Sequence, residues 1–248
     1  VGGDYRDTSY EKTLGDAAPP ALILFDTAQD PFDLSRSNWG VYGEVLAPVL
    51  PSVELTGAVR YDSISGTKDA FTGLTHGSSQ SETTYKVGLK WSPIDSLAIR
   101  GSYATGFRVA AMREIAQPIV DFGVTGGVFN CPFNAGFAPL GYYAAGYVCP
   151  NNLQYEVRQG GNANLKPETS KQWNAGFVWS PSRDVSMGVN YWSVEVENAV
   201  SSVSEALLFG NPSSYLDLFT TKVVGGLTYV AMLEAPVNIG RQQNEGID

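Results

Sequence analysis

The chain has 248 residues, of which 43% are hydrophobic and only 17% are charged, below the roughly 25% of average soluble domains. The formal net charge of −9 and the pI near 4.6 argue against a nucleic-acid partner, which would require a basic face. Even ALILF at 21–25, among the longest apolar runs, is far shorter than the roughly 18 residues of a membrane-spanning helix.

The candidate strands follow one another along almost the whole chain. In five of them, at 53–61, 83–91, 97–107, 173–179 and 185–191, apolar side chains alternate with polar or small ones, and this period of two predicts a strand with one apolar face. Gly, Thr, Ser, Tyr and Val also recur where a helix would favour Ala, Leu, Glu and Lys. We therefore expect an all-β protein, with nine strands near residues 1–11, 38–47, 53–63, 82–92, 96–107, 169–180, 184–199, 227–234 and 237–248.

Short and long connections take turns between these strands. Short links such as SPIDS at 92–96 contain Pro, Ser and Asp, which favour turns. The long excursions run over residues 12–37, 64–81, 109–167 and 201–226. A soluble β-sandwich would not segregate its connections in this way, whereas an outer-membrane barrel has short periplasmic turns and long extracellular loops. This arrangement predicts a transmembrane antiparallel β-barrel.

The alternation also predicts which side chains face lipid and which face the barrel lumen. The apolar set expected to contact lipid is Leu55, Val59, Val87, Leu89, Ile99, Phe177 and Val189. The cations expected to point into the lumen are Arg60, Lys86, Lys90 and Arg100. A slip of one residue would place these charges in hydrocarbon, at about 2–4 kcal/mol each near the midplane.

Four segments, in this order along the chain, resemble TonB-dependent outer-membrane receptors. They are VYGEVLAPVLPSVELTGAVRYDSIS at 41–65, SYATGFRVAAMREI at 102–115, the stretch at 160–200 that begins GGNANLKPETS, and NIGRQQNEGID at 238–248. Two departures are Val109-Ala110, where the family usually has Ala-Pro, and Asn174-Ala175, where Glu-Leu is usual.

The resemblance implies a 22-stranded barrel in the outer membrane of a Gram-negative bacterium, of which residues 1–248 form about nine strands and their loops. The family's plug domain and TonB box are not expected in this chain. The implied function is uptake of a scarce solute (a ferric siderophore, haem, cobalamin or an oligosaccharide) with energy delivered through TonB. Its partners would be that extracellular small molecule or metal chelate, TonB through the missing plug region, and outer-membrane lipid. A passive porin or a barrel-based surface adhesin is the alternative.

The long extracellular loop at 109–167 is the candidate site of ligand capture. Its aromatic rings can stack on sugars or on catecholate and porphyrin rings, and two arginines lie at the end of the preceding strand. The candidate ligand-binding residues are Arg108, Arg113, Phe129, Phe133, Tyr142, Tyr143 and Tyr147. Two alternatives remain open: an aromatic loop that packs on itself, and a salt-bridge cluster at the rim.

Cys131 and Cys149 lie in this loop, and the only histidine, His76, is far away in sequence. Zinc would require four ligands at short spacings, so we expect no metal site. A disulfide worth about 3 kcal/mol fits an oxidising compartment better, with two free thiols as the alternative. Neither a cofactor nor an enzyme activity is expected, because no nucleophile–base pair is present. Gly126-Gly127 is interpreted as a turn, since it lacks the Lys-Ser/Thr of a phosphate loop.

Overall fold

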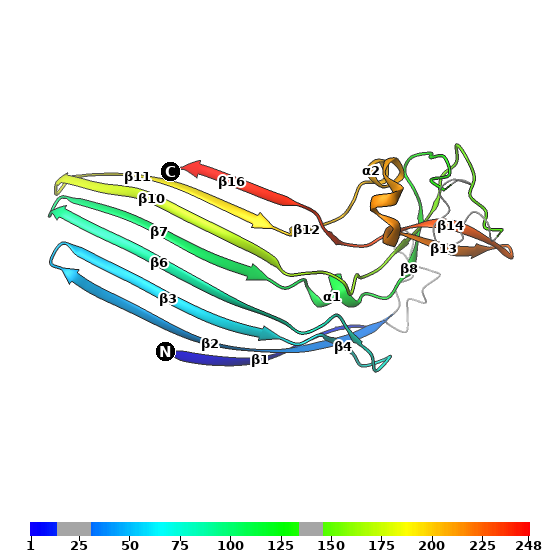
Figure 1. Cartoon of the computed structure of the whole chain (residues 1–248), viewed down its shortest axis with the longest axis horizontal. Coiled ribbons are helices and arrows are strands. Elements are labelled where there is room, and N and C mark those ends of the chain that lie inside the picture. Colours follow the sequence, from blue (N-terminus) through cyan, green and yellow to red (C-terminus); the bar gives the residue numbers. More distant parts are fainter. Residues whose placement is uncertain (14–30, 134–145) are drawn as a thin grey trace.

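The structure is a computed structural model that describes residues 1–13, 31–133 and 146–248 (Figure 1). Its largest part is an antiparallel sheet, which we call the wall. The wall strands are β1 (Gly2–Lys12), β2 (Phe32–Leu50), β3 (Val53–Ile64), β6 (Gln80–Ile94), β7 (Leu97–Arg108), β10 (Glu168–Ser182), β11 (Val185–Glu197) and β16 (Arg241–Ile247). Within the described ranges, no helix is long and apolar enough to cross a membrane.

Shorter elements lie in the excursions. The strands are β4 (Thr67–Asp69), β5 (Thr75–His76), β8 (Val120–Val124), β9 (Glu156–Gln159), β12 (Val200–Ser201), β13 (Phe219–Val224), β14 (Leu227–Glu234) and β15 (Val237–Asn238). The helices are α1 (Met112–Ala116), α2 (Glu205–Gly210) and the 3-10 turns η2 (Pro212–Ser214) and η3 (Leu216–Leu218). In Figure 1 the excursions gather at one end of the wall and the short turns at the other, which we call the cap end and the turn end.

Wall strands that follow one another in the chain are hydrogen-bonded neighbours, in the order β1-β2-β3-β6-β7-β10-β11-β16. The register shifts beside each of the three short turns, directly after Pro48 and across Pro93 and Pro181. Proline has no N–H to give to the ladder, so the pairing is interrupted there. The three prolines therefore help to end the spanning strands at the turn end.

The all-β fold and the antiparallel wall predicted from the sequence are confirmed, but one strand was assigned to the wrong sheet. Residues 227–234 do form a strand, yet β14 pairs with β13 and β9 outside the wall. The expected strand at 237–248 is divided into β15 and β16. Among the described residues the sheet has ten strands: the eight long strands of the wall, and the short β4 and β5, which extend it beside β2. The wall thus has eight long strands rather than nine, and the last excursion runs over 198–240 rather than 201–226.

The two faces of the wall differ as the alternation predicts. Directly opposite residues share a face, so the pairs Leu55–Leu89, Val59–Tyr85 and Ile99–Phe177 define an apolar face. The seven side chains expected to face lipid all lie on it, with exposed fractions between 37% and 53%. The pairs Arg60–Thr84 and Lys90–Arg100 lie on the opposite, polar face, where two hollows open.

A band of aromatic rings crosses the apolar face on its cap side. Ring centroids lie 5.5 Å apart in Trp39–Tyr61, 6.0 Å in Tyr85–Tyr103 and 4.9 Å in Trp173–Tyr191. Beyond the band the same face becomes charged, as in the 2.9 Å ion pair of Lys171 and Glu197. Tyr191 lies in the middle of β11, so the band crosses this strand well before its cap end. The band therefore marks the place where the apolar zone ends and the strands continue into a polar environment.

Candidate functional site

The excursions at 109–167 and 198–240 fold together into one body, which we call the cap. Its sheet has the order β13-β14-β9-β8, with two strands from each excursion. The pair β9–β14 is parallel and joins the excursions directly, with Val157 opposite Met232. Figure 1 shows this sheet and α2 beyond the cap end of the wall. The loop at 109–167 is therefore not an independent unit, because half of its sheet comes from another part of the sequence.

The cap has a hydrophobic core to which both excursions contribute. The first supplies Phe133 and Tyr155, exposed by 1% and 2%, and the second supplies Leu208, exposed by 0%. The Phe133 ring meets Phe219 edge-on, with centroids 5.0 Å apart. Burial raises the pKa of Tyr155 to about 12. Removing a core side chain from either excursion should therefore disturb both.

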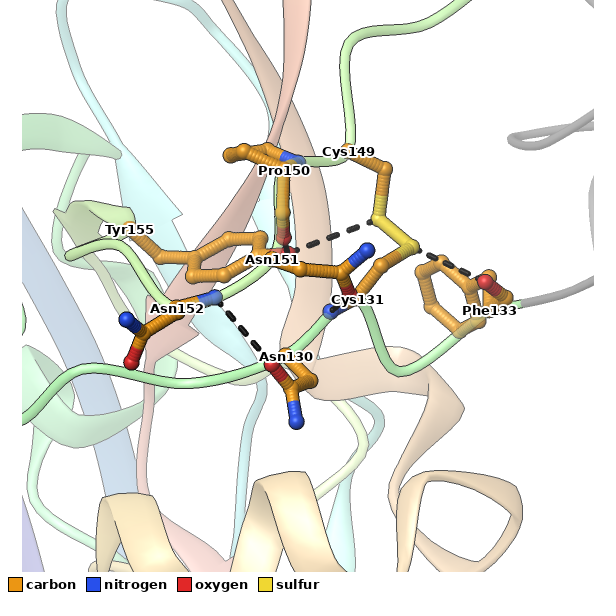
Figure 2. Close-up of a disulfide and its surroundings, with 8 residues drawn as sticks. All are labelled: Asn130, Cys131, Phe133, Cys149, Pro150, Asn151, Asn152 and Tyr155. Atoms are coloured by element: carbon orange, nitrogen blue, oxygen red, sulfur yellow. Dashed lines mark hydrogen bonds between the residues drawn. A yellow bond between two sulfur atoms is a disulfide. The ribbon is translucent and has the colours of Figure 1, made fainter.

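A disulfide joins Cys131 to Cys149 at the edge of this core, with Cα atoms 5.2 Å apart (Figure 2). The Asn151 side-chain oxygen accepts the Cys131 N–H at 3.0 Å. The Tyr155 hydroxyl lies 3.6 Å from the Cys149 sulfur and donates to the Pro150 carbonyl at 2.5 Å. The bond thus holds the segments on either side of 134–145 against the buried Tyr155 ring.

Two polar contacts clip the excursions together outside the core. The Glu205 carboxylate at the start of α2 accepts the N–H groups of Gly126 and Gly127, at 2.9 and 3.1 Å. Lys222 on β13 bonds Glu156 on β9 at 2.8 Å. That hydrogen bond raises the pKa of Lys222 against the opposing effect of burial. The Gly126-Gly127 amides therefore bind a carboxylate of the protein itself.

The rim is the line where β7 and β10 leave the wall for the cap. Arg108 forms an ion pair with Glu168 and a second one with Glu114 at 3.2 Å. The Glu114 carboxylate also accepts the Ala111 N–H at 2.6 Å, ahead of α1. Glu168 accepts the Val200 N–H at 2.7 Å. Arg108 is thus engaged in the rim salt-bridge cluster that the sequence left open as an alternative.

The Asn238 side chain joins the end of the first excursion to the start of the second by hydrogen bonds. Its side-chain oxygen accepts the Lys166 N–H at 2.9 Å. Its amide group donates to the carbonyls of Lys166 and Asn198, at 2.9 and 2.8 Å. Asn198 and Gly240, at the two ends of the second excursion, both have a φ of 55°, which asparagine and glycine adopt more readily than other residues. Local backbone geometry and one amide side chain thereby fix the entry and exit of the second excursion.

The candidate ligand-binding residues are not gathered on one surface. Phe133 lies in the core, Tyr147 packs against it, and Phe129 stacks on Phe209 with centroids 4.3 Å apart. Tyr142 and Tyr143 lie outside the described residues. Arg113 lies on α1, and its Nε donates to the Gln117 side-chain oxygen at 2.8 Å. The described members thus occupy three places: the rim, the core and the surroundings of α1.

Arg113 borders a hollow of about 340 Å³ at the seam between cap and rim. Polar side chains from both excursions line this seam hollow, among them Gln117, Gln159 and Glu234. Among the described residues, the buried Gln117 Nε2 has no hydrogen-bond partner. The seam hollow thus presents to a polar ligand the Arg113 cation, the Glu234 carboxylate and neutral amide side chains. No described group of histidine, cysteine or acidic residues could hold a metal ion.

The sequence predicted an excursion at 201–226 but not that it extends to 240 and supplies half of the cap sheet, so Glu234 was missed as a lining residue of the seam hollow beside Arg113. The available signal was Gly225-Gly226 between two apolar, β-branched runs, a pattern typical of a tight hairpin. Both glycines have positive φ, 58° and 83°. The hairpin β13–β14 that they permit is the second excursion's contribution to the cap sheet.

The wall and cap together define a class of protein. Short turns at one end, long folded excursions at the other, and an apolar face edged by aromatic rings are the features of a transmembrane β-barrel. The chain belongs to the family described as TonB dependent receptor-like, beta-barrel, whose model matches residues 1–248. This is a family of Gram-negative outer-membrane proteins, and its members are transport receptors rather than enzymes.

Solved structures of such receptors share the fold. The siderophore receptor PirA from Acinetobacter baumannii matches with a TM-score of 0.58 at 12% identity, over 87% of this chain and 25% of that one. The ferric enterobactin receptor PfeA from Pseudomonas aeruginosa, in complex with enterobactin, gives a TM-score of 0.56 at 14% identity, over 87% and 24%. The Serratia marcescens hemophore receptor HasR, in complex with its hemophore HasA and heme, gives 0.50 at 14%, over 99% and 38%. This chain thus spans about a quarter of the length of PirA and PfeA.

Proposed function

We propose that the chain forms part of the barrel wall and the outer cap of a receptor that takes up a scarce solute across the outer membrane, with energy supplied through TonB. The solute would be a ferric siderophore, haem, cobalamin or an oligosaccharide. TonB would act through the plug region, and outer-membrane lipid would surround the apolar face. The observation that carries the proposal is the family match over residues 1–248, on a wall whose two faces divide into apolar and polar.

The cap is the proposed site of solute capture. We place the cap end outside the cell and the turn end in the periplasm, because outer-membrane barrels have long extracellular loops and short periplasmic turns. The seam hollow supports a role in binding because it combines Arg113, Glu234 and Gln117, whose Nε2 has no hydrogen-bond partner among the described residues. The aromatic residues Phe129 and Phe133 would act chiefly by holding the cap in shape.

The test is uptake by the full-length receptor in cells that lack other uptake receptors. PirA, PfeA and HasR are named for siderophore or haem-carrier ligands, so iron-labelled ferric enterobactin and haem are the first solutes to supply. We expect accumulation of one solute that stops when TonB is deleted. Uptake that continues without TonB would instead identify a passive porin. Cell adhesion without uptake of any solute of the four classes would identify a surface adhesin.

A pair of variants links uptake to the seam hollow. Arg113→Gln removes the cation that borders the hollow, and we expect it to weaken binding of the accepted solute. Arg183→Gln is the matched control, because Arg183 is exposed at the turn end. Equal binding by both variants would exclude the seam hollow as a capture site while leaving the uptake function standing.

A further inference from the structure

Three cations on β6 and β7, on the polar face of the wall, form no ion pair with any described acidic residue. Strands β3, β6, β7 and β10 carry six lysine and arginine residues. Three of them, Arg60, Arg108 and Lys171, form ion pairs. The other three are Lys86, Lys90 and Arg100, and no described acidic side chain forms an ion pair with them. The chain has 25 acidic against 16 basic residues, so carboxylates are not scarce.

The unpaired cations are held close to one another by the strand register. Lys90 on β6 stands directly opposite Arg100 on β7, and Lys86 lies on the same face of β6. Like charges directly opposite each other on neighbouring strands are destabilising. Glu54 on β3 faces Lys90 from the other side but forms no ion pair with it. The wall therefore keeps a repulsive pair that an anion would relieve.

A hollow of about 350 Å³ opens in front of these side chains, and all three cations line it. No acidic residue belongs to its lining, whose other polar members are Thr56, Ser102, Asn174 and Asn190. Gly88 keeps the floor open, since a Cβ there would lie 3.1 Å from the Thr56 hydroxyl oxygen. The lining thus offers positive charge together with neutral hydrogen-bonding groups.

In the larger hollow beside it, of about 620 Å³, a cation on the same face is neutralised by carboxylates of the chain itself. There, Arg60 bonds Asp4 at 2.8 Å and Asp62 at 2.6 Å. The two hollows share Lys86 in their linings and differ in this neutralisation. The smaller hollow thus combines all three of these cations with a lining that contains no carboxylate.

We propose that the hollow between β3, β6, β7 and β10 binds an oxyanion, a carboxylate or phosphate group carried by a solute inside the barrel. The planar Arg100 guanidinium would take two oxygens of the group, while Lys90 and Lys86 add point charges. Arg100 lies three residues from the turn-end start of β7 and eight from its rim end. The site is thus deep in the lumen, away from the cap, and does not depend on which solute the cap captures.

The test uses the full-length receptor purified in detergent, with calorimetric titration of inorganic phosphate and of citrate at constant ionic strength. We expect the wild type to bind at least one probe. Binding of phosphate alone or of citrate alone identifies the preferred oxyanion. The double variant Lys90→Gln/Arg100→Gln should bind at least tenfold more weakly, whereas Arg183→Gln, which alters an exposed cation at the turn end, should bind like the wild type.

Thermal unfolding without either probe gives a second measurement, which does not require a ligand. At low salt the double variant should unfold at a higher temperature than the wild type, because the repulsion between Lys90 and Arg100 is gone. The proposal is overturned if the wild type binds neither probe, if the double variant binds as tightly as the wild type, or if Arg183→Gln loses as much affinity. A failure of the full-length receptor to take up solute in cells would contradict the proposed uptake function, but it would not change the outcome of this binding test.

Discussion

Glu168 and Arg108 form an ion pair at the point where β10 and β7 meet the rim. Glu168 uses its other oxygen to accept the Val200 N–H at 2.7 Å. One carboxylate therefore connects the wall to both excursions: the 109–167 excursion leaves the wall just after Arg108 and returns to it at Glu168, and Val200 lies near the start of the 198–240 excursion. The stability of the cap should depend on this side chain more than on any exposed surface pair.

Glu168→Gln is predicted to loosen the cap without unfolding the wall. Glutamine keeps an acceptor for the Val200 N–H but removes the charge that binds Arg108. Because Arg108 is half exposed, we expect a loss of about 1 kcal/mol in the opening free energy of β9 and β14, measured by amide hydrogen exchange. Glu82→Gln, on the polar face of β6 near the cap end, is the control. Equal exchange in the two variants would contradict a role for Glu168 in anchoring the cap.

Breaking the disulfide should destabilise the cap more strongly. Cys131 and Cys149 are 18 residues apart, and closing a loop of that length stabilises a fold by about 3 kcal/mol in the chain-entropy account. We expect Cys131→Ser/Cys149→Ser to expose the segment around the buried Tyr155 to protease while the wall stays folded. Peptide mass spectrometry without reduction should show the crosslink in the wild type. Alkylatable thiols on both cysteines would contradict the disulfide.

The two faces of β6 should respond differently to the same new charge. Val87 lies on the apolar face, with 53% of its surface exposed, and Thr84 lies on the polar face beside the larger hollow. Val87→Lys should cost about 2–4 kcal/mol near the middle of the bilayer. Thr84→Lys should cost less, about 1 kcal/mol at most, because its charge stands opposite Arg60 but faces the polar lumen. The measurement is urea unfolding of the full-length receptor in lipid vesicles. Equal costs would contradict the assignment of the faces.

Asp69 should make the turn after β4 sensitive to acid. The side chain is 4% exposed, and burial tends to raise its pKa, but hydrogen bonds from Thr72 and from the Phe71 N–H outweigh burial and hold the pKa below its ordinary value of 3.8. A carboxyl with a lowered pKa stabilises the fold above that ordinary value, and this stability is lost as the pH falls through the lowered pKa.

The turn at 69–74 should therefore lose amide protection below about pH 4, after correction for intrinsic exchange. Asp69→Asn should weaken the turn by about 1–2 kcal/mol at pH 6 and remove the acid-dependent part. Lys68→Gln changes the charge of the neighbouring residue, which donates none of these hydrogen bonds, and serves as control. An unchanged pH response in Asp69→Asn would exclude Asp69 as its source.

The wall could be predicted from the sequence because its faces and turns are determined by residues that are close together in the chain. Alternation along Thr83–Trp91 fixes the two faces of β6, and the proline-containing turns fix which strands are neighbours. Strands β7 and β10 pair across the 109–167 excursion, as expected where every backbone group in lipid must find a strand partner. The positions of Arg60, Lys86, Lys90 and Arg100 follow from the same alternation.

The cap was beyond this reasoning because its core is assembled from distant segments. Val157 lies opposite Met232 in a parallel pair, which no local pattern predicts. The run at 227–234 is apolar enough to form a strand, and only its contact with β9 and β13 shows to which sheet it belongs. The aromatic residues of the first excursion indicated a core as readily as a ligand site, and Phe133 lies in a core.

The shared core leads to a prediction about the cap as a whole. Leu208 on α2 is 0% exposed, whereas its neighbour Leu207 is 45% exposed. Leu208→Ala should cost about 2–5 kcal/mol, since it leaves a cavity among buried side chains. Because the core spans both excursions, we expect faster hydrogen exchange in β9, which belongs to the other excursion, and weaker binding of the captured solute. Leu207→Ala should leave both unchanged. Faster exchange confined to 198–240 would show that the excursions are stable separately, and the cap would then not be a single cooperative unit.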